Sequence, residues 1–157
     1  MFKDGNIEGV VVRHLKKYTD GRGWLIELYR EDELDPEFHP VMSYISTTNP
    51  GIARGPHEHV DQADLFGFIG PSTFKIYLWD YRKNSPTFMN KMVFLAGKDK
   101  PTAVLVPCGV VHAYMNVGNQ PGMVTNYPNR LFAGKGRKDQ VDEIRHENDP
   151  NTIFKID

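Results

Sequence analysis

Turn-forming residues recur along this chain at short intervals, and that spacing constrains the fold more than any other feature. Clusters of Gly, Pro, Asn and Asp occur, for example, at Asn49–Gly51 and Gly70–Ser72. The runs between such clusters are short and rich in β-branched and aromatic residues, as in Thr73–Tyr81 and Ala103–Val106. Short strands separated by turns at this pitch predict an all-β sandwich or barrel.

Helical sequence is scarce, and the length of the chain suits one domain. Arg30–Asp35 and Lys138–His146 could each form one helical turn. The part of the chain from about residue 130 is polar and glycine-rich, and we expect it to be rich in loops. With 157 residues, the chain can bury one hydrophobic core. We therefore expect a single domain over residues 1–157.

The net charge and the cysteine content limit which kinds of partner and which cellular compartment we expect. The net charge is −1, so no field of the whole molecule favours nucleic acid. The single cysteine, Cys108, excludes an intrachain disulfide and indicates a reducing compartment. The first residues lack the apolar stretch of a signal peptide, and no apolar run is long enough to cross a bilayer. We expect a cytoplasmic protein with neither a nucleic-acid nor a membrane partner.

Three of the six histidines lie in segments that a β-barrel would bring together. His57 and His59 are two residues apart, and residues at that spacing project from the same face of a strand. His112 follows a tight turn in the segment Pro107–Asn116. If the two strands are neighbours, the three imidazoles converge on one pocket. They could instead be hydrogen-bonded filling without chemistry, but a polar interior is costly unless it is used.

The two histidine segments resemble the two sequence motifs of the cupin superfamily, whose members fold as small jelly-roll β-barrels. The second motif is complete over Pro107–Asn116, whereas in the first motif Asp64 stands about where a glutamate is expected. Metal-binding cupins use these positions as ligands. As an alternative to a metal-free site, this resemblance implies one divalent transition metal held by His57, His59, Asp64 and His112.

A longer set of segments resembles the nucleotide-sugar epimerase branch of the cupins, typified by dTDP-4-dehydrorhamnose 3,5-epimerase. The most specific match is Ser85–Phe88, with the family's Ser-Pro-Thr-Phe. The matching segments, in chain order, are Asp20–Glu27, Gly51–His57, Gln62–Phe66, Trp79–Phe88, Val106–His112 and Asn148–Pro150. This resemblance implies an isomerase or epimerase that acts on a nucleotide-linked 4-keto-deoxysugar and needs no cofactor.

The same resemblance implies roles for individual residues. His57 stands at the position of the base that removes a proton next to the ketone. Arg22 and Arg54 stand where arginines hold the sugar-linked diphosphate. The other substrate-binding positions that we expect are Gln62, Asp64 and Asn126. In related epimerases an N-terminal strand crosses to the partner, so we expect a homodimer in which Arg22 completes the neighbour's site.

Three residues of the family's catalytic set are missing from this sequence. The lysine that steadies the enolate is replaced by Asp64. The proton-donating tyrosine, counted from His112, falls at Thr125–Asn126, which makes Tyr127 the nearest candidate. The late aspartate that pairs with the base would lie beyond the last residue, and Asp61 or Asp64 could substitute for it.

A further resemblance concerns the second histidine of the first motif. Arg54–His59 is similar to the Arg-Gly-x-His-x-His of sugar 3,4-ketoisomerases, in which two histidines move protons on one face of a similar substrate. It gives His59, or His112, the role of a second proton carrier. Three hypotheses therefore stay open: an isomerase of a keto sugar nucleotide, a metal-dependent cupin, and a non-catalytic protein that binds sugar nucleotides.

Overall fold

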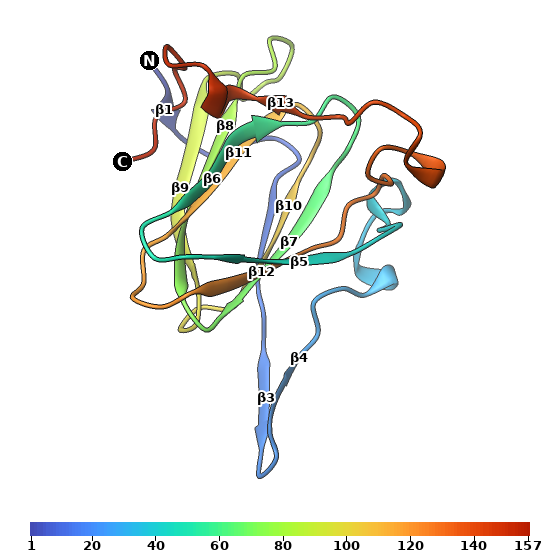
Figure 1. The fold of residues 1–157 in the computed structure, drawn as a ribbon, viewed down its shortest axis with the longest axis vertical. Coiled ribbons are helices and arrows are strands. Elements are labelled where there is room, and N and C mark those ends of the chain that lie inside the picture. The colour runs from blue at the N-terminus through green and yellow to red at the C-terminus, as the bar shows by residue number, and fades with distance from the viewer.

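Two sheets pack face to face in the computed structural model, which describes residues 1–157 (Figure 1). The strands are β1 (Lys3–Asp4), β2 (Val11–His14), β3 (Lys17–Asp20), β4 (Gly23–Ile26), β5 (Tyr44–Thr48), β6 (Ala53–Glu58), β7 (Asp64–Gly70), β8 (Thr73–Asp80), β9 (Asn90–Gly97), β10 (Thr102–Val106), β11 (Val110–Asn116), β12 (Gly122–Asn126) and β13 (Ile144–Arg145). One sheet has the order β1-β9-β8-β11-β6-β13 and the other the order β2-β10-β7-β12-β5. The all-β prediction is confirmed.

The main hydrophobic core lies between the sheets and is filled by alternate residues of the strands. Phe66 and Phe68 of β7 point into it from one sheet, and Phe74 of β8 points into it from the other. Leu65, which is one residue out of phase, packs on the outer face. The ring of Phe66 lies 5.5 Å from that of His112, so the apolar core directly borders the histidines.

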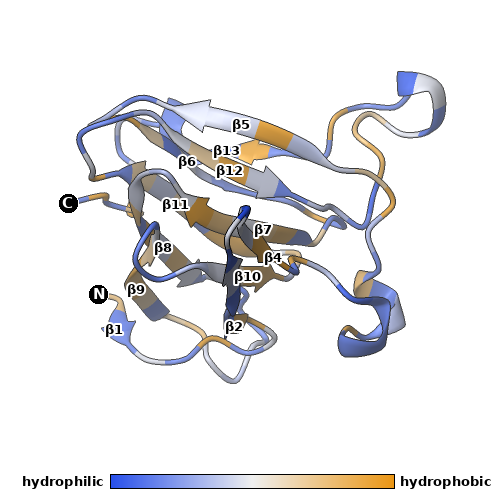
Figure 2. Cartoon of the chain, turned by 90° about the horizontal axis from the view of Figure 1, so that it is seen from below, coloured by the Kyte–Doolittle hydropathy of each residue, from blue (hydrophilic) through white to orange (hydrophobic).

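Hydrophobic residues are concentrated on the central strands of the two sheets. Figure 2 shows hydrophobic colouring on the central strands, such as β7, β9 and β11, whereas the loops that project from the sheets are hydrophilic. On the outer face of the first sheet, Phe154 packs against Trp79 and Tyr77. The C-terminal segment is thus held against β8 by apolar contact.

Helix is limited to four single turns of 3-10 helix, at Glu31–Glu33, Pro36–Phe38, Lys135–Arg137 and His146–Asn148. The turn expected within Arg30–Asp35 is confirmed, but the one expected over Lys138–His146 is wrong. Part of that segment forms β13 and pairs with β6, which uses the backbone groups that a helix would need. None of the helical turns has the length and apolar character that a membrane span requires.

The β3–β4 hairpin forms a separate two-stranded sheet that projects from the body of the molecule (Figure 1). It carries large side chains that are open to solvent: Tyr18 is 48%, Trp24 52% and Leu25 60% exposed. A lone hairpin is only marginally stable in water, and exposed apolar residues on it favour contact with another surface. The hairpin therefore has the exposed apolar side chains of a segment that packs against another protein surface.

The Ser85–Phe88 block has a structural role in the loop after β8. Its Ser85 and Thr87 hydroxyls donate hydrogen bonds to the fully buried carboxylate of Asp80, and Arg82 adds a third donor, Nε, at 2.9 Å. Burial alone would raise the pKa of Asp80, but these donors outweigh it and lower the pKa to about 2. The block most typical of the epimerases thus pins a loop to the barrel.

This network predicts acid sensitivity of the fold. Asp80→Asn removes the negative charge and replaces one acceptor oxygen by an NH₂ group, which leaves some of these donors unpaired, and it should lower the free energy of unfolding by about 2–4 kcal/mol at pH 7. The folded pKa lies below the ordinary value of 3.8, so this stabilisation is present above that pH and is lost as the pH falls toward about 2. Urea denaturation at both ends of this range should show a smaller acid loss in the variant. The exposed Asp99→Asn is the control, and equal acid losses in wild type and Asp80→Asn would contradict the account.

Candidate functional site

A cavity of about 1000 Å³ lies between the two sheets. Tyr44 and Ser46 of β5 line one side of it, and Arg54 and His57 of β6 line another. Residues between 128 and 147 contribute much of the remaining lining. The cavity thus has walls from both sheets and from the loop-rich C-terminal part of the chain.

The structure brings the three expected histidines together at this cavity. β6 and β11 pair antiparallel with His57 directly opposite His112, and the two ring centroids are 4.4 Å apart. His59, just beyond β6, has its ring 5.7 Å from each of the others. His57 and His59 line the cavity, whereas His112 is buried behind them and only 3% exposed.

Gly55 makes this close pairing possible. Its φ of 83° lies in the left-handed region that favours glycine, and a Cβ there would be 2.5 Å from the carbonyl oxygen of His112. Any larger residue would push β6 away from β11. The Arg-Gly-x-His pattern is therefore needed for the backbone as well as for the chemistry.

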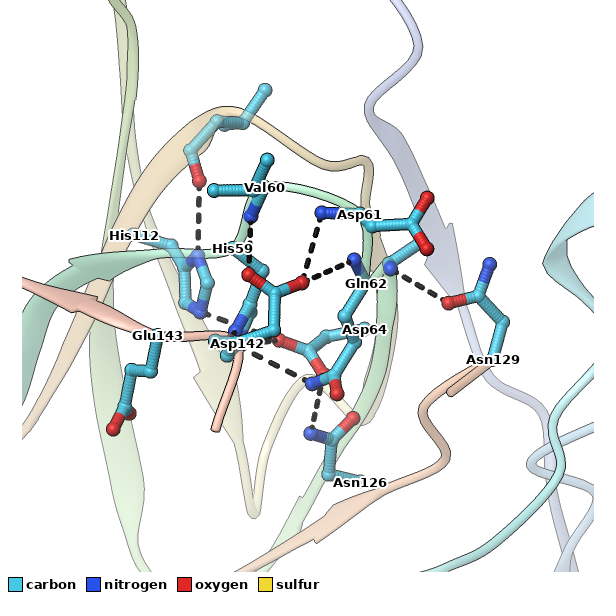
Figure 3. Close-up of polar contacts among 12 residues, drawn as sticks. His59, Val60, Asp61, Gln62, Asp64, His112, Asn126, Asn129, Asp142 and Glu143 are labelled. Atoms are coloured by element: carbon cyan, nitrogen blue, oxygen red, sulfur yellow. Dashed lines mark hydrogen bonds and ion pairs between the residues drawn. The ribbon is translucent and has the colours of Figure 1, made fainter. Parts of the chain in front are cut away.

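Asp64 is the charged centre of the cluster (Figure 3). Its Oδ2 lies 3.1 Å from Nε2 of His59 and 3.5 Å from Nε2 of His112. Its Oδ1 accepts hydrogen bonds from the amide nitrogens of Gln62, at 2.8 Å, and Asn126, at 2.9 Å. Burial alone would raise the pKa of Asp64, but the hydrogen bond from His59 and the nearby rings outweigh it and lower the pKa to about 2. Asp64 is thus an ionised, fully surrounded carboxylate.

The surroundings shift the pKa values of the histidines in opposite directions. Burial, helped by the neighbouring rings of His112 and His59, lowers the pKa of His57 to about 2. Burial also lowers the pKa of His112. For His59, burial works in the same direction, but the hydrogen bond and charge of Asp64 outweigh it and raise the pKa. Both ring nitrogens of His59 lie against acceptors, the Asp142 carbonyl and the Asp64 carboxylate, whereas His57 is held in the neutral form.

Asp142 holds the loop that carries His59, and sequence reasoning missed it. Its carboxylate accepts three consecutive backbone N–H groups, from Val60 at 2.7 Å, Asp61 at 2.8 Å and Gln62 at 2.9 Å (Figure 3). Its backbone carbonyl accepts the hydrogen bond from Nδ1 of His59. One residue therefore fixes both the loop and the orientation of the ring. No sequence pattern signals a contact between positions 83 residues apart.

Arg145 and Glu143 are two further residues that the sequence did not single out. Arg145 of β13 pairs in register with His57 of β6, and directly opposite residues share one face of a sheet. Its Nε donates to Glu143 at 2.6 Å. Both side chains line the cavity, so β13 adds a charged pair beside His57.

The two predicted arginines lie in different places. Arg54 lines the cavity, where its guanidinium donates to the Thr48 hydroxyl at 3.0 Å and to the Thr47 carbonyl at 2.8 Å. No carboxylate forms an ion pair with it, so its charge is available to an anion. Arg22 lies at the turn of the β3–β4 hairpin, 91% exposed and paired with Asp20. It does not line the cavity of its own chain.

Tyr127 lies apart from the histidines, and Asp61 lines the cavity without contacting His57. Because successive residues alternate across the sheet, Asn126 faces Asp64 while Tyr127 packs with Leu65 on the outer face. This placement argues against Tyr127 as the proton donor. Asp61 pairs with Arg130 at 2.8 Å, and Asp64 contacts His59 and His112, so neither suggested substitute pairs with the base position. The tyrosines that do line the cavity are Tyr44 and Tyr114.

The cluster also has the donor types of a transition-metal site. Ligand atoms of His57, His59 and His112 lie within 4.8 Å of one another, and the Asp64 carboxylate adjoins two of them. Nδ1–H of His112 donates to the Val110 carbonyl at 3.0 Å, which leaves Nε2 without a proton and without a partner. The ligand types, three imidazole nitrogens and one carboxylate, therefore suit a transition-metal ion.

Sequence comparisons find relatives along most of the chain. The sequence model of a family described as dTDP-4-dehydrorhamnose 3,5-epimerase matches residues 4–136. The spore coat polysaccharide biosynthesis protein SpsL of Bacillus subtilis is 34% identical over 147 residues, which are 94% of this chain and 93% of that protein. The probable low-salt glycan biosynthesis epimerase Agl13 of Haloferax volcanii is 33% identical over 128 residues, 81% of each chain.

Solved structures agree on the fold. A dTDP sugar isomerase from Desulfovibrio desulfuricans G20 has a TM-score of 0.79 at 21% identity, over 92% of this chain and 87% of that one. NovW, a 4-keto-6-deoxy sugar epimerase from Streptomyces spheroides, has a TM-score of 0.76 at 18% identity, over 96% of this chain and 79% of that one. These likenesses confirm the expected cupin barrel. Since the family's sequence model covers most of the residues that build the barrel and its histidine site, the chain belongs to the dTDP-4-dehydrorhamnose 3,5-epimerase family.

Proposed function

We propose that this protein isomerises a nucleotide-linked 4-keto-deoxysugar by removing a proton from a carbon next to the ketone. The observation that carries the proposal is the unprotonated ring of His57 in the wall of a cavity of about 1000 Å³. The relatives support the substrate class. NovW is a 4-keto-6-deoxy sugar epimerase, and a related epimerase of Legionella pneumophila is in complex with dTDP-4-keto-L-rhamnose.

His57 is the base in this proposal. A proton next to a ketone is acidic because the electron pair that it leaves behind is delocalised onto the oxygen. The lowered pKa keeps His57 unprotonated at any physiological pH, but a pKa of about 2 also makes the free ring a weak base, so the transfer depends on charge that develops in the bound substrate. The negative charge that develops on the neighbouring enolate raises its proton affinity during the transfer.

His59 is the positively charged partner of the neutral base His57 in this proposal. Its two ring nitrogens lie against the Asp142 carbonyl and the Asp64 carboxylate, and both of these acceptors favour the protonated, positively charged form of the ring. A cation here takes over part of the task of the family's lysine, whose position Asp64 occupies, because it can stabilise enolate charge. His112 is the most buried of the three histidines, its pKa is lowered by burial, and its ring packs against that of His57.

Substrate binding falls to Arg54 and to polar residues that arrange Asp64. The charge of Arg54 has no carboxylate partner, which suits it to a diphosphate. The side-chain amides of Gln62 and Asn126 donate hydrogen bonds to Asp64, so we assign them the task of holding that carboxylate against His59.

We also propose a homodimer in which the β3–β4 hairpin lies on the partner and brings Arg22 into the partner's cavity. The exposed Trp24 and Leu25 support this arrangement, as does the position of Arg22 outside its own cavity. The cytoplasmic location and the lack of a nucleic-acid partner stay predictions.

A metal centre is the second candidate, favoured by the unpartnered Nε2 of the buried His112. His57, His59, Asp64 and His112 would hold the ion, which would supply Lewis-acid chemistry. However, an ion would have to displace the proton that His59 shares with Asp64. We therefore expect elemental analysis of the purified protein to find less than about 0.1 equivalent of Fe, Mn, Ni or Zn. Nearly one equivalent, lost in His59→Ala, would overturn the metal-free account.

Solvent exchange tests the role of His57. In D₂O with dTDP-4-keto-6-deoxyglucose, the wild type should incorporate deuterium next to the ketone, and His57→Asn should slow this by about 10²–10⁴-fold. Because the pKa of His57 is lowered, the acid limb of the rate profile should lie below the ordinary histidine value of 6.5. The exposed His14→Asn is the control. If the wild type binds dTDP but exchanges no proton, the protein is a non-catalytic binder.

Mixed dimers test the crossing of Arg22. Arg22→Ala and His57→Asn should each be inactive alone. After unfolding and refolding together, half of the dimers are mixed and half of their sites are intact, so roughly a quarter of the wild-type exchange rate should return. If Arg22 serves its own chain, no intact site can form and the mixture will stay inactive.

A further inference from the structure

A tyrosine hydroxyl in the cavity wall has a hydrogen without an acceptor. Tyr44 stands at the start of β5, lines the cavity and is 45% exposed, so a ligand can reach it. Its oxygen accepts one hydrogen bond, of 2.9 Å, from the side-chain amide of Asn126. Tyr44 makes no other hydrogen bond with its hydroxyl, and its O–H is therefore free to donate into the cavity.

Asp64 fixes the direction of that hydrogen bond. The same nitrogen of Asn126 donates to Oδ1 of Asp64 at 2.9 Å, and an ionised carboxylate can only accept. The amide must therefore turn its NH₂ group, with two hydrogens, toward both Asp64 and Tyr44. As a result Tyr44 must accept with its oxygen, which leaves its own hydrogen for a third group.

Tyr44 and His57 face the cavity from different sheets. β5 is the edge strand of the five-stranded sheet, and β6 belongs to the six-stranded sheet (Figure 2). Both side chains line the same cavity. A sugar ring held between the two strands would have the base on one side and the hydroxyl on the other.

Building on the proposed function, we infer that Tyr44 is the catalytic acid that completes inversion of the carbon next to the ketone. His57 takes the proton from one face of that carbon, and the electron pair of the C–H bond forms the enolate. Tyr44 then gives its hydroxyl proton to the carbon from the opposite face, and the ketone re-forms as the enolate pair makes the new C–H bond. Protonated His57 and ionised Tyr44 remain. Water takes one proton from the former and supplies one to the latter.

The other tyrosines are less suited to this step. Tyr114 is only 5% exposed, and its hydroxyl is engaged with the Ser46 hydroxyl at 3.4 Å. Tyr127 packs on the outer face of the sheet with Leu65. Burial raises the pKa of Tyr44 to about 12, so that its proton is in place at neutral pH.

Tyr44→Phe removes only the hydroxyl and separates the two halves of the reaction. With dTDP-4-keto-6-deoxyglucose in D₂O, His57 of the variant can still take a proton and return deuterium to the same face. We expect exchange within about threefold of the wild type, while formation of the inverted sugar falls at least about 100-fold. Tyr81→Phe, which loses the same atom away from the cavity, is the matched control, and thermal unfolding checks that each variant folds.

Each outcome decides one point. Inversion at the wild-type rate in Tyr44→Phe overturns the role of Tyr44 and leaves His57 as the base. Loss of inversion in Tyr127→Phe but not in Tyr44→Phe assigns the acid to Tyr127 instead. If the wild type neither exchanges nor inverts, the proposed function itself fails, and the role of Tyr44 fails with it.

Discussion

The buried carboxylate of Asp64 is the constraint on which the whole site depends. An ionised group that is only 1% exposed is stable only if donors surround it, and here His59, Gln62 and Asn126 supply them. The hydrogen bond to Asp64 in turn fixes the protonation or the orientation of the donating side chain. His59 becomes charged, and Asn126 is turned so that the hydroxyl of Tyr44 faces the cavity. The residue that replaces the family's lysine thus organises a different set of partners.

The pKa values of two histidines that are two residues apart are shifted in opposite directions by their surroundings. His57 faces the rings of His59 and His112, and burial there favours the neutral form. His59 lies between the Asp142 carbonyl and Asp64, both of which favour the charged form. The proposed enolate chemistry would use these two histidines together, His57 as the base and His59 as the positively charged partner, in place of the family's lysine.

Much of the fold and part of the site could be predicted from the sequence, and the limits have physical causes. Strand periodicity and turn residues gave the barrel, and the i, i+2 spacing brought His57 and His59 to one face. Counting along the chain placed Tyr127 near the pocket, but alternation across the sheet turns it outward and turns Asn126 inward. Asp142 and Tyr44 act through tertiary hydrogen bonds that no local pattern encodes.

A crystal structure with dTDP and an unreactive sugar nucleotide would test the central claim most directly. The account predicts a sugar ring between His57 and Tyr44, with the carbon next to C4 within reach of the imidazole and the diphosphate on Arg54. It also predicts that the hairpin of the second copy, with its Arg22, reaches the same diphosphate. An ion bound by His57, His59 and His112, or a sugar that does not touch His57, would contradict the account.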